Sequence, residues 1–108
     1  MAGENEVLQS IAEYLWYNKI FFYRNGNTPV YQPDTKRYRA MPKWSMKGVS
    51  DIVGIYKGKP LYIEVKKPKP KTYPSQEQKD FIETVNKEGG IAFVARSIDD
   101  VIAGLKRG

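Results

Sequence analysis

Hydrophobic residues near the start of the chain recur with the period of an α-helix. Leu8, Ile11 and Leu15 lie three or four residues apart within residues 4–18, which predicts a helix with these side chains on one side. Glu4 lies one turn before Leu8, so the same spacing predicts that it shares this inward-facing stripe. A carboxylate on a buried stripe is costly unless it is paired or bound to a metal, although an acidic residue also favours the N-terminus of a helix by itself.

The rest of the chain alternates strand-like and helix-like patterns. Short apolar runs at residues 20–24 and 91–95 predict two strands. Residues 75–88 predict a helix, because Ser and Gln stand three residues apart at its start, as in a capping box, and two glycines follow its end. A last helix begins near Ser97 and directs its apolar residues inward.

Two apolar segments flank a Lys57-Gly58 turn and predict a β-hairpin. If the turn has two residues, Asp51 faces Glu64; with a four-residue loop, Asp51 faces Lys66 and lies diagonal to Glu64. Both registers therefore gather two carboxylates and one ammonium group. Directly opposed like charges destabilise a strand pair, and a divalent cation would relieve that repulsion.

Residues 25–47 are rich in Asn, Gly, Pro and charged residues, and they predict a long loop. Basic and aromatic side chains alternate in it, a combination that contacts phosphates and stacks on unpaired bases. Trp44 has an alternative role, which is to fill the edge of the core. A second basic segment, residues 67–71, alternates Lys with Pro and predicts a stiff connector. The candidate nucleic-acid contacts are Arg24, Lys36, Arg37, Arg39, Lys43, Trp44, Lys47, Lys67 and Lys69.

The composition narrows the chemistry that this chain can perform. With 108 residues it is expected to be a single domain, residues 1–108. It has no histidine, which excludes His-based acid–base catalysis, His-metal nuclease sites and Ser-His triads, and no cysteine, which excludes disulfides and thiolate metal sites. The net charge is +6, and residues 19–71 hold 13 Lys and Arg against 3 Asp and Glu. A basic segment that encloses a few carboxylates suits a site for phosphates and a metal ion.

Several of these motifs, in this order, resemble the virus-type replication-repair nuclease (VRR-NUC) family of the PD-(D/E)XK nuclease superfamily. They are the first-helix acid, Lys47–Asp51, Ile63–Lys66 and Ser75-x-x-Gln78, and the resemblance covers nearly the whole chain. Ser50 stands where the superfamily has Pro. The resemblance implies an α/β (α+β) restriction-endonuclease-like fold with an αβββαβα core and a central mixed sheet flanked by helices.

The same resemblance implies a DNA endonuclease that depends on Mg²⁺ or Mn²⁺. Asp51, Glu64 and the main-chain carbonyl of Val65 are then the metal ligands, and carboxylate oxygens suit these hard cations. Lys66 lies on the same strand face as Glu64, where it can orient the attacking water or stabilise developing negative charge.

Two further residues belong to the implied catalytic set. Glu4 is the better candidate for the first-helix acid, with Glu6 as the fallback. Gln78 is implied to lie near the same site, and its alternative role is the capping box alone.

The resemblance also implies the substrate and the assembly. Small proteins of this kind in the family are typically homodimers that cut branched DNA such as four-way junctions, and a two-fold dimer supplies the two cuts that a junction needs. Trp16, Tyr17 and Phe22 are candidates for the apolar interface, and their alternative place is the core. The alternatives are a non-catalytic DNA-binding module with a nuclease fold and an RNA nuclease. Without a helix-turn-helix or zinc-finger pattern, we expect recognition of backbone and shape.

The location expected for such a protein is the cytoplasm. No stretch approaches the roughly 20 apolar residues of a membrane span, and the N-terminus has neither the basic nor the apolar region of a secretory signal. The resemblance to a virus-type family is compatible with a phage-encoded protein that acts in the host cell.

Overall fold

The computed structural model describes residues 3–26, 31–32, 37–38, 44 and 46–107. No helix in this described part of the chain is long and apolar enough to cross a membrane. The elements in chain order are α1 (Glu4–Tyr17), β1 (Phe21–Arg24), β2 (Tyr31–Gln32), β3 (Arg37–Tyr38), β4 (Ile52–Tyr56), β5 (Lys59–Val65), α2 (Gln76–Lys87), β6 (Ile91–Ala95) and α3 (Ile98–Lys106).

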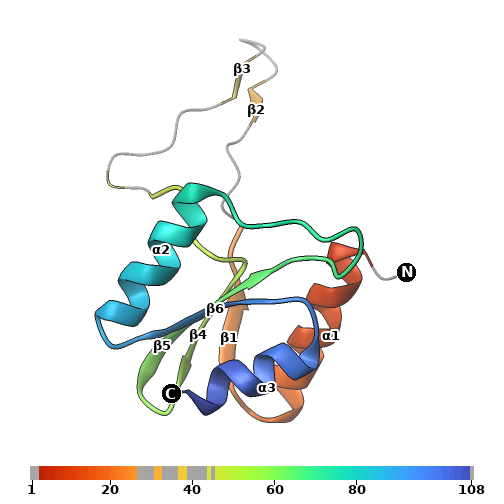
Figure 1. The fold of residues 1–108 in the computed structure, drawn as a ribbon, viewed down its shortest axis with the longest axis vertical. Helices are drawn as coiled ribbons and strands as arrows, with labels where there is room; N and C mark the ends of the chain where they lie inside the picture. The colour runs from red at the N-terminus through yellow and green to blue at the C-terminus, as the bar shows by residue number, and fades with distance from the viewer. Residues whose placement is uncertain (1–2, 27–30, 33–36, 39–43, 45, 108) are drawn as a thin grey trace.

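The four longer strands form one mixed sheet with the order β1-β4-β5-β6. β4 pairs antiparallel with both β1 and β5, whereas β6 pairs parallel with β5 and follows it through α2. Figure 1 shows α1 and α3 on one side of the sheet and α2 on the other. This is the α/β fold predicted from the sequence, with the αβββαβα order and one small addition, the β2–β3 ladder.

The hairpin has the two-residue turn, not the four-residue loop. Tyr56 pairs with Lys59, and Ile52 pairs with Ile63. Lys57 and Gly58 have φ values of 50° and 81°, as in the type I′ turns that match the twist of a β-hairpin. This register continues to Asp51 and Glu64, because each step along one strand is matched by one step back along the other.

The core lies between the sheet and the pair α1 and α3. The apolar stripe of α1 faces it, as its spacing predicts, and alternate residues of β4, β5 and β6 point into it. Its fully or almost fully buried members include Val7, Leu8, Ile11, Leu15, Ile52, Leu61, Ile63, Val65, Phe93, Val101 and Leu105.

α2 covers only half of the opposite face of the sheet. Its Phe81 ring meets the edge of Tyr62 on β5, with ring centroids 4.8 Å apart. The Asn86 side chain accepts a hydrogen bond from the Ala92 main-chain N–H (2.8 Å) and donates one to the Ala92 carbonyl (2.9 Å), which occupies the outer edge of β6. The half of this face formed by β1 and β4 carries exposed side chains instead.

Two sequence predictions about local structure are wrong. Residues 25–47 are not without secondary structure, since Tyr31 pairs with Tyr38 in the β2–β3 ladder; tyrosine favours strands, and two short segments close in sequence pair readily. Glu4 does not lie on the buried stripe of α1, because it is exposed and burial begins at Val7. An acid in the first turn still interacts favourably with the helix dipole.

Candidate active site

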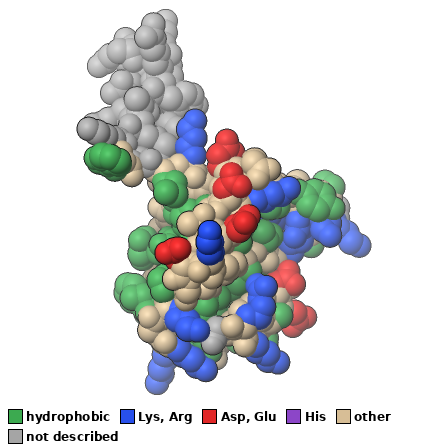
Figure 2. Space-filling model, turned by 60° about the vertical axis from the view of Figure 1, so that its left-hand side comes forward, with side chains coloured by type: hydrophobic (Ala, Val, Ile, Leu, Met, Phe, Trp, Pro, Cys, Tyr) green, Lys and Arg blue, Asp and Glu red, His purple; other side chains and the backbone are tan. Residues whose placement is uncertain are grey.

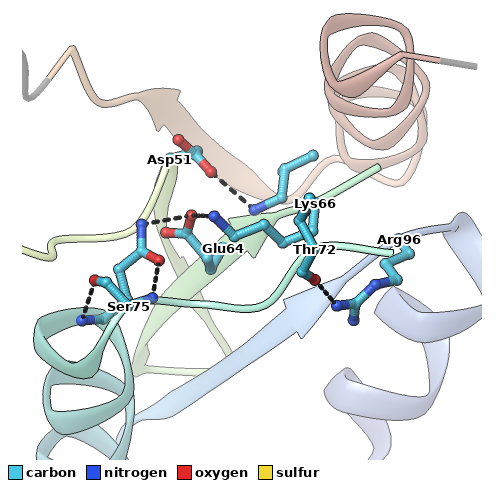
Figure 3. A network of polar contacts seen from close by, with 8 residues as sticks. Asp51, Glu64, Lys66, Thr72, Ser75 and Arg96 are labelled. Carbon is cyan, nitrogen blue, oxygen red and sulfur yellow. Dashed lines mark hydrogen bonds and ion pairs between the residues drawn. The ribbon is translucent and has the colours of Figure 1, made fainter. Parts of the chain in front are cut away.

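The predicted carboxylates meet at one end of the β4–β5 ladder. Asp51 directly precedes β4, and its Oδ2 accepts a hydrogen bond of 2.8 Å from the main-chain N–H of Val65 (Figure 3). On its other side, the Asp51 carbonyl accepts a bond of 2.7 Å from the N–H of Asn25. Asp51 is therefore held from both neighbouring strands, and its carboxylate turns toward the end of β5.

Glu64 is the buried member of the site, with only 2% of its surface exposed. Its Oε2 accepts a hydrogen bond of 3.0 Å from the side-chain amide of Gln78 and lies 3.5 Å from the Lys66 Nζ. Its other oxygen, Oε1, is buried and has no hydrogen-bond partner in the described part of the chain. A buried oxygen without a donor costs free energy, so this oxygen is available to a cation.

The surroundings of Glu64 favour its protonated form when no cation is present. The pKa of Glu64 is raised to about 8 from an ordinary value of 4.5, chiefly by burial and also by the negative charge of Asp51, while the Lys66 ammonium opposes both effects. The like-charge conflict expected from the hairpin register is thus present in the folded protein.

Gln78 has both of the roles that the sequence left as alternatives. The side-chain oxygen of Gln78 accepts a hydrogen bond from the main-chain N–H of Ser75 (2.8 Å). The main-chain N–H of Gln78 donates one to the Ser75 Oγ (3.2 Å), which completes the capping box of α2. The same amide donates through its nitrogen to Glu64. The main-chain N–H of Ser75 occupies the amide oxygen of Gln78, so the amide nitrogen of Gln78 faces Glu64. The helix cap thereby orients the Glu64 carboxylate.

Gly48 joins the segment before Asp51 to the start of α2. Its φ is +84°, and a Cβ there would lie 2.6 Å from the main-chain carbon and oxygen of Glu77 and 2.9 Å from the nitrogen of Gln78. Only glycine allows such a close approach of two backbones. This contact fixes the segment that carries Asp51 against the turn that carries Gln78.

Gly48 and Asn25 are positioning residues that sequence reasoning missed. Gly48 stands within a motif that was quoted, but a glycine in a loop does not reveal what its backbone touches. Asn25 was assigned to the loop, although its N–H extends the pairing of β1 with β4 by one residue.

The contact at Gly48 leads to a stability prediction with an internal control. Gly48→Ala is expected to destabilise the protein by about 2 kcal/mol or more beyond Gly58→Ala, because both glycines have φ near +80° but only Gly48 faces backbone atoms. Gly58→Ala should cost about 1–2 kcal/mol for its left-handed backbone alone. Urea unfolding of the two variants measures the difference, and equal losses would show that the Gly48 contact is unimportant.

The remaining candidates lie around the site or outside the described residues. Glu4 is exposed at the start of α1 and makes no hydrogen bond or ion pair with Asp51 or Glu64 among the described residues. Trp44 is 91% exposed, so the alternative in which it fills the edge of the core is wrong. Arg24, Lys47 and Lys69 are exposed, and Lys67 is half-buried. Lys36, Arg39 and Lys43 lie outside the described residues, as does the side chain of Arg37.

The donor set fits Mg²⁺ or Mn²⁺ with few protein ligands. No group of three His, Cys, Asp or Glu side chains converges among the residues that the structure describes, so the candidates are the two carboxylates and the Val65 carbonyl. Mg²⁺ commonly binds through one or two carboxylates and keeps several waters. The unpartnered Glu64 Oε1 and the raised pKa of Glu64 both indicate a site in which a cation would compensate negative charge.

No protein-family model matches this chain, and neither does any curated protein. The functional argument below therefore rests on the arrangement of Asp51, Glu64, Lys66 and Gln78.

Proposed function

We propose that this protein is a Mg²⁺- or Mn²⁺-dependent DNA endonuclease that hydrolyses phosphodiester bonds, as its resemblance to VRR-NUC nucleases implies. The observation that carries the proposal is the convergence of two carboxylates and an ammonium group: Asp51 bonds to the end of β5, and the Lys66 Nζ lies 3.5 Å from Glu64 Oε2. A salt bridge alone would not explain why the second Glu64 oxygen is buried without a partner.

Each residue has a distinct role in this mechanism. A bound divalent cation would supply an activated water and stabilise the charge of the transition state. Asp51, Glu64 and the Val65 carbonyl would hold it. Gln78 keeps Glu64 oriented through Oε2, so that Oε1 stays available. The Lys66 ammonium, on the same strand face, orients the attacking water or stabilises developing negative charge.

The exposed surface of α2 carries charges of both signs. Its acidic residues are Glu77, Asp80 and Glu83, and its lysines are Lys79 and Lys87. Figure 2 shows acidic side chains in the upper and middle part of the visible face, with Lys and Arg side chains among them and along its lower and right-hand margins. Because the phosphate backbone contributes most of the affinity for DNA, we infer that this mixed surface contributes less to DNA binding than the basic residues of 19–71 do.

Action as a homodimer on branched DNA remains part of the proposal. Trp16 and Tyr17 are exposed at the end of α1, beside a pocket of about 480 Å³ that Lys19, Ile20 and Phe21 also line. Phe22, the third residue predicted for the interface, packs against the core instead. The exposed Trp16 and Tyr17 therefore support an apolar interface that does not include Phe22.

Cleavage assays with and without metal test the proposal. Supercoiled plasmid should be nicked in Mg²⁺ or Mn²⁺ and left intact in EDTA, because without a cation the site lacks the activated water and the stabilisation of the transition-state charge. Asp51→Asn is the matched inactive control. Tight DNA binding without any cleavage would replace this proposal by the non-catalytic binding module, and cleavage of RNA alone would make the protein a ribonuclease.

The same assay addresses the branched substrate and the dimer. A four-way junction should be cut faster than a linear duplex of the same sequence, and light scattering at micromolar concentration should give twice the mass of the chain. A monomer that cuts both substrates equally would leave the nuclease standing and remove this part of the proposal.

A further inference from the structure

The open half of the sheet lies on the same face as the candidate metal site. Side chains two residues apart on a strand share a face, so Tyr62 lies on the Glu64 side of β5. Tyr62 pairs with Val53, and Val53 pairs with Tyr23. The face that carries Glu64 therefore continues across β4 to the edge strand β1.

Aromatic and apolar side chains are exposed along this half of the face. Phe21 is 61% exposed, Tyr23 54% and Ile55 53%, and α2 packs mainly on β6 and β5. A groove of about 330 Å³ runs over these strands. We call it the β1–β4 groove, and its lining includes Phe21, Tyr23, Val53, Ile55, Pro60 and Tyr62.

The groove leads to the carboxylates in steps of one strand repeat. The N–H of Asn25 bonds to Asp51, and Tyr23 comes two residues earlier on β1. Successive residues on one strand face lie about 7 Å apart. Tyr23 is thus one such step from Asn25, which lies opposite Asp51 on the neighbouring strand, and Phe21 is a second step.

The charges around the groove are positive. Lys19 and Arg24 stand at the two ends of β1, and Lys57 and Lys59 stand at the turn of the hairpin. Residues 18–26 and 52–60 contain no acidic residue. This border attracts phosphates, whereas a second copy docked symmetrically over the groove would bring like charges together.

We propose that the β1–β4 groove binds unpaired nucleotides of the DNA strand that enters the metal site, with a base stacked on Tyr23. Aromatic side chains on an open sheet bind bases in this way, and the interaction tolerates any base because each has a π-face. The inference rests on the proposed nuclease function. It refines the proposed substrate: among branched DNAs, those with unpaired nucleotides beside the cut should bind best, since fully paired strands keep their bases stacked on one another.

The test compares oligonucleotides with and without bases. Fluorescence anisotropy in EDTA measures binding of a labelled oligo-dT and of an abasic strand of equal length. Tyr23→Ala should weaken binding of oligo-dT about 5- to 150-fold, the range expected for one lost stacking contact, and leave the abasic strand unaffected. Tyr23→Trp should retain the affinity of the wild type. Tyr73→Ala removes an exposed tyrosine outside the groove and should change neither affinity.

Three results with Tyr23→Ala would overturn the proposal. The first is unchanged binding of oligo-dT, and the second is an equal loss of affinity for oligo-dT and for the abasic strand. The third is a fall of this variant from dimer to monomer in light scattering, which would make the groove a protein interface. Plasmid cleavage by the wild type, run in parallel, reports on the proposed function alone. An active nuclease with unchanged Tyr23→Ala binding would refute the groove only. A wild-type protein that cleaves no plasmid but shows the expected base-dependent binding would refute the proposed hydrolysis and leave the groove proposal standing.

Discussion

Replacing Lys66 by Ala is expected to slow metal-dependent DNA cleavage by about 10²–10³-fold, the usual loss when one group that stabilises the transition state is removed. The Lys66 Nζ lies 3.5 Å from Glu64 Oε2, so the ammonium acts where the attacking water and the phosphate would meet the carboxylates. No histidine is present to take over this role.

Binding of DNA should survive this substitution, because most of the basic residues in residues 19–71 remain. Single-turnover cleavage and anisotropy measurements with the same substrate separate the two effects. Lys66→Met keeps most of the side-chain volume and should be as inactive as Lys66→Ala. Lys106→Ala removes one exposed lysine from α3 and should behave as the wild type. Cleavage at the wild-type rate by either Lys66 variant would exclude Lys66 from the chemistry.

Glu64 is expected to make the metal-free protein less stable as the pH rises. The pKa of Glu64 is about 8 in the folded protein, against an ordinary value of 4.5. Below 4.5 both the folded and unfolded chains hold the proton, and Glu64 adds no pH dependence. Between 4.5 and 8 only the folded chain holds it, so the free energy of unfolding falls by up to about 1.4 kcal/mol per pH unit. Above pH 8 the loss is complete.

Glu64→Gln removes the titrating group and should flatten this slope. In EDTA at pH 8 the variant should be more stable than the wild type by an amount on the order of a few kcal/mol, because no buried charge forms. Urea unfolding from pH 5 to pH 9 measures both curves. Glu83→Gln, at an exposed position on α2, should keep the wild-type slope. Added Mn²⁺ at pH 8 should stabilise the wild type and not Glu64→Gln, since binding to the folded state adds to stability. Parallel curves for the wild type and Glu64→Gln in EDTA would contradict the raised pKa.

The sequence by itself determined the features that depend on neighbours along the chain. The spacing of Leu8, Ile11 and Leu15 was enough to place the buried stripe of α1. Both hairpin registers that the sequence allowed bring the two carboxylates together, and the structure has the one with the two-residue turn at Lys57 and Gly58. These predictions succeeded because helix period and turn length act over a few residues.

Only the tertiary structure decided how distant elements meet. Helical spacing put Glu4 on the inward stripe, but Glu4 is exposed and the buried residues of α1 begin at Val7. The capping box did not reveal that the same Gln78 amide also holds Glu64, and Gly48 gave no sign of its contact with α2. The exposure of Tyr23 depends on α2 packing mainly on β6 and β5. Local periodicity tells which side of an element is apolar, whereas the packing of separate elements decides which side chains are covered.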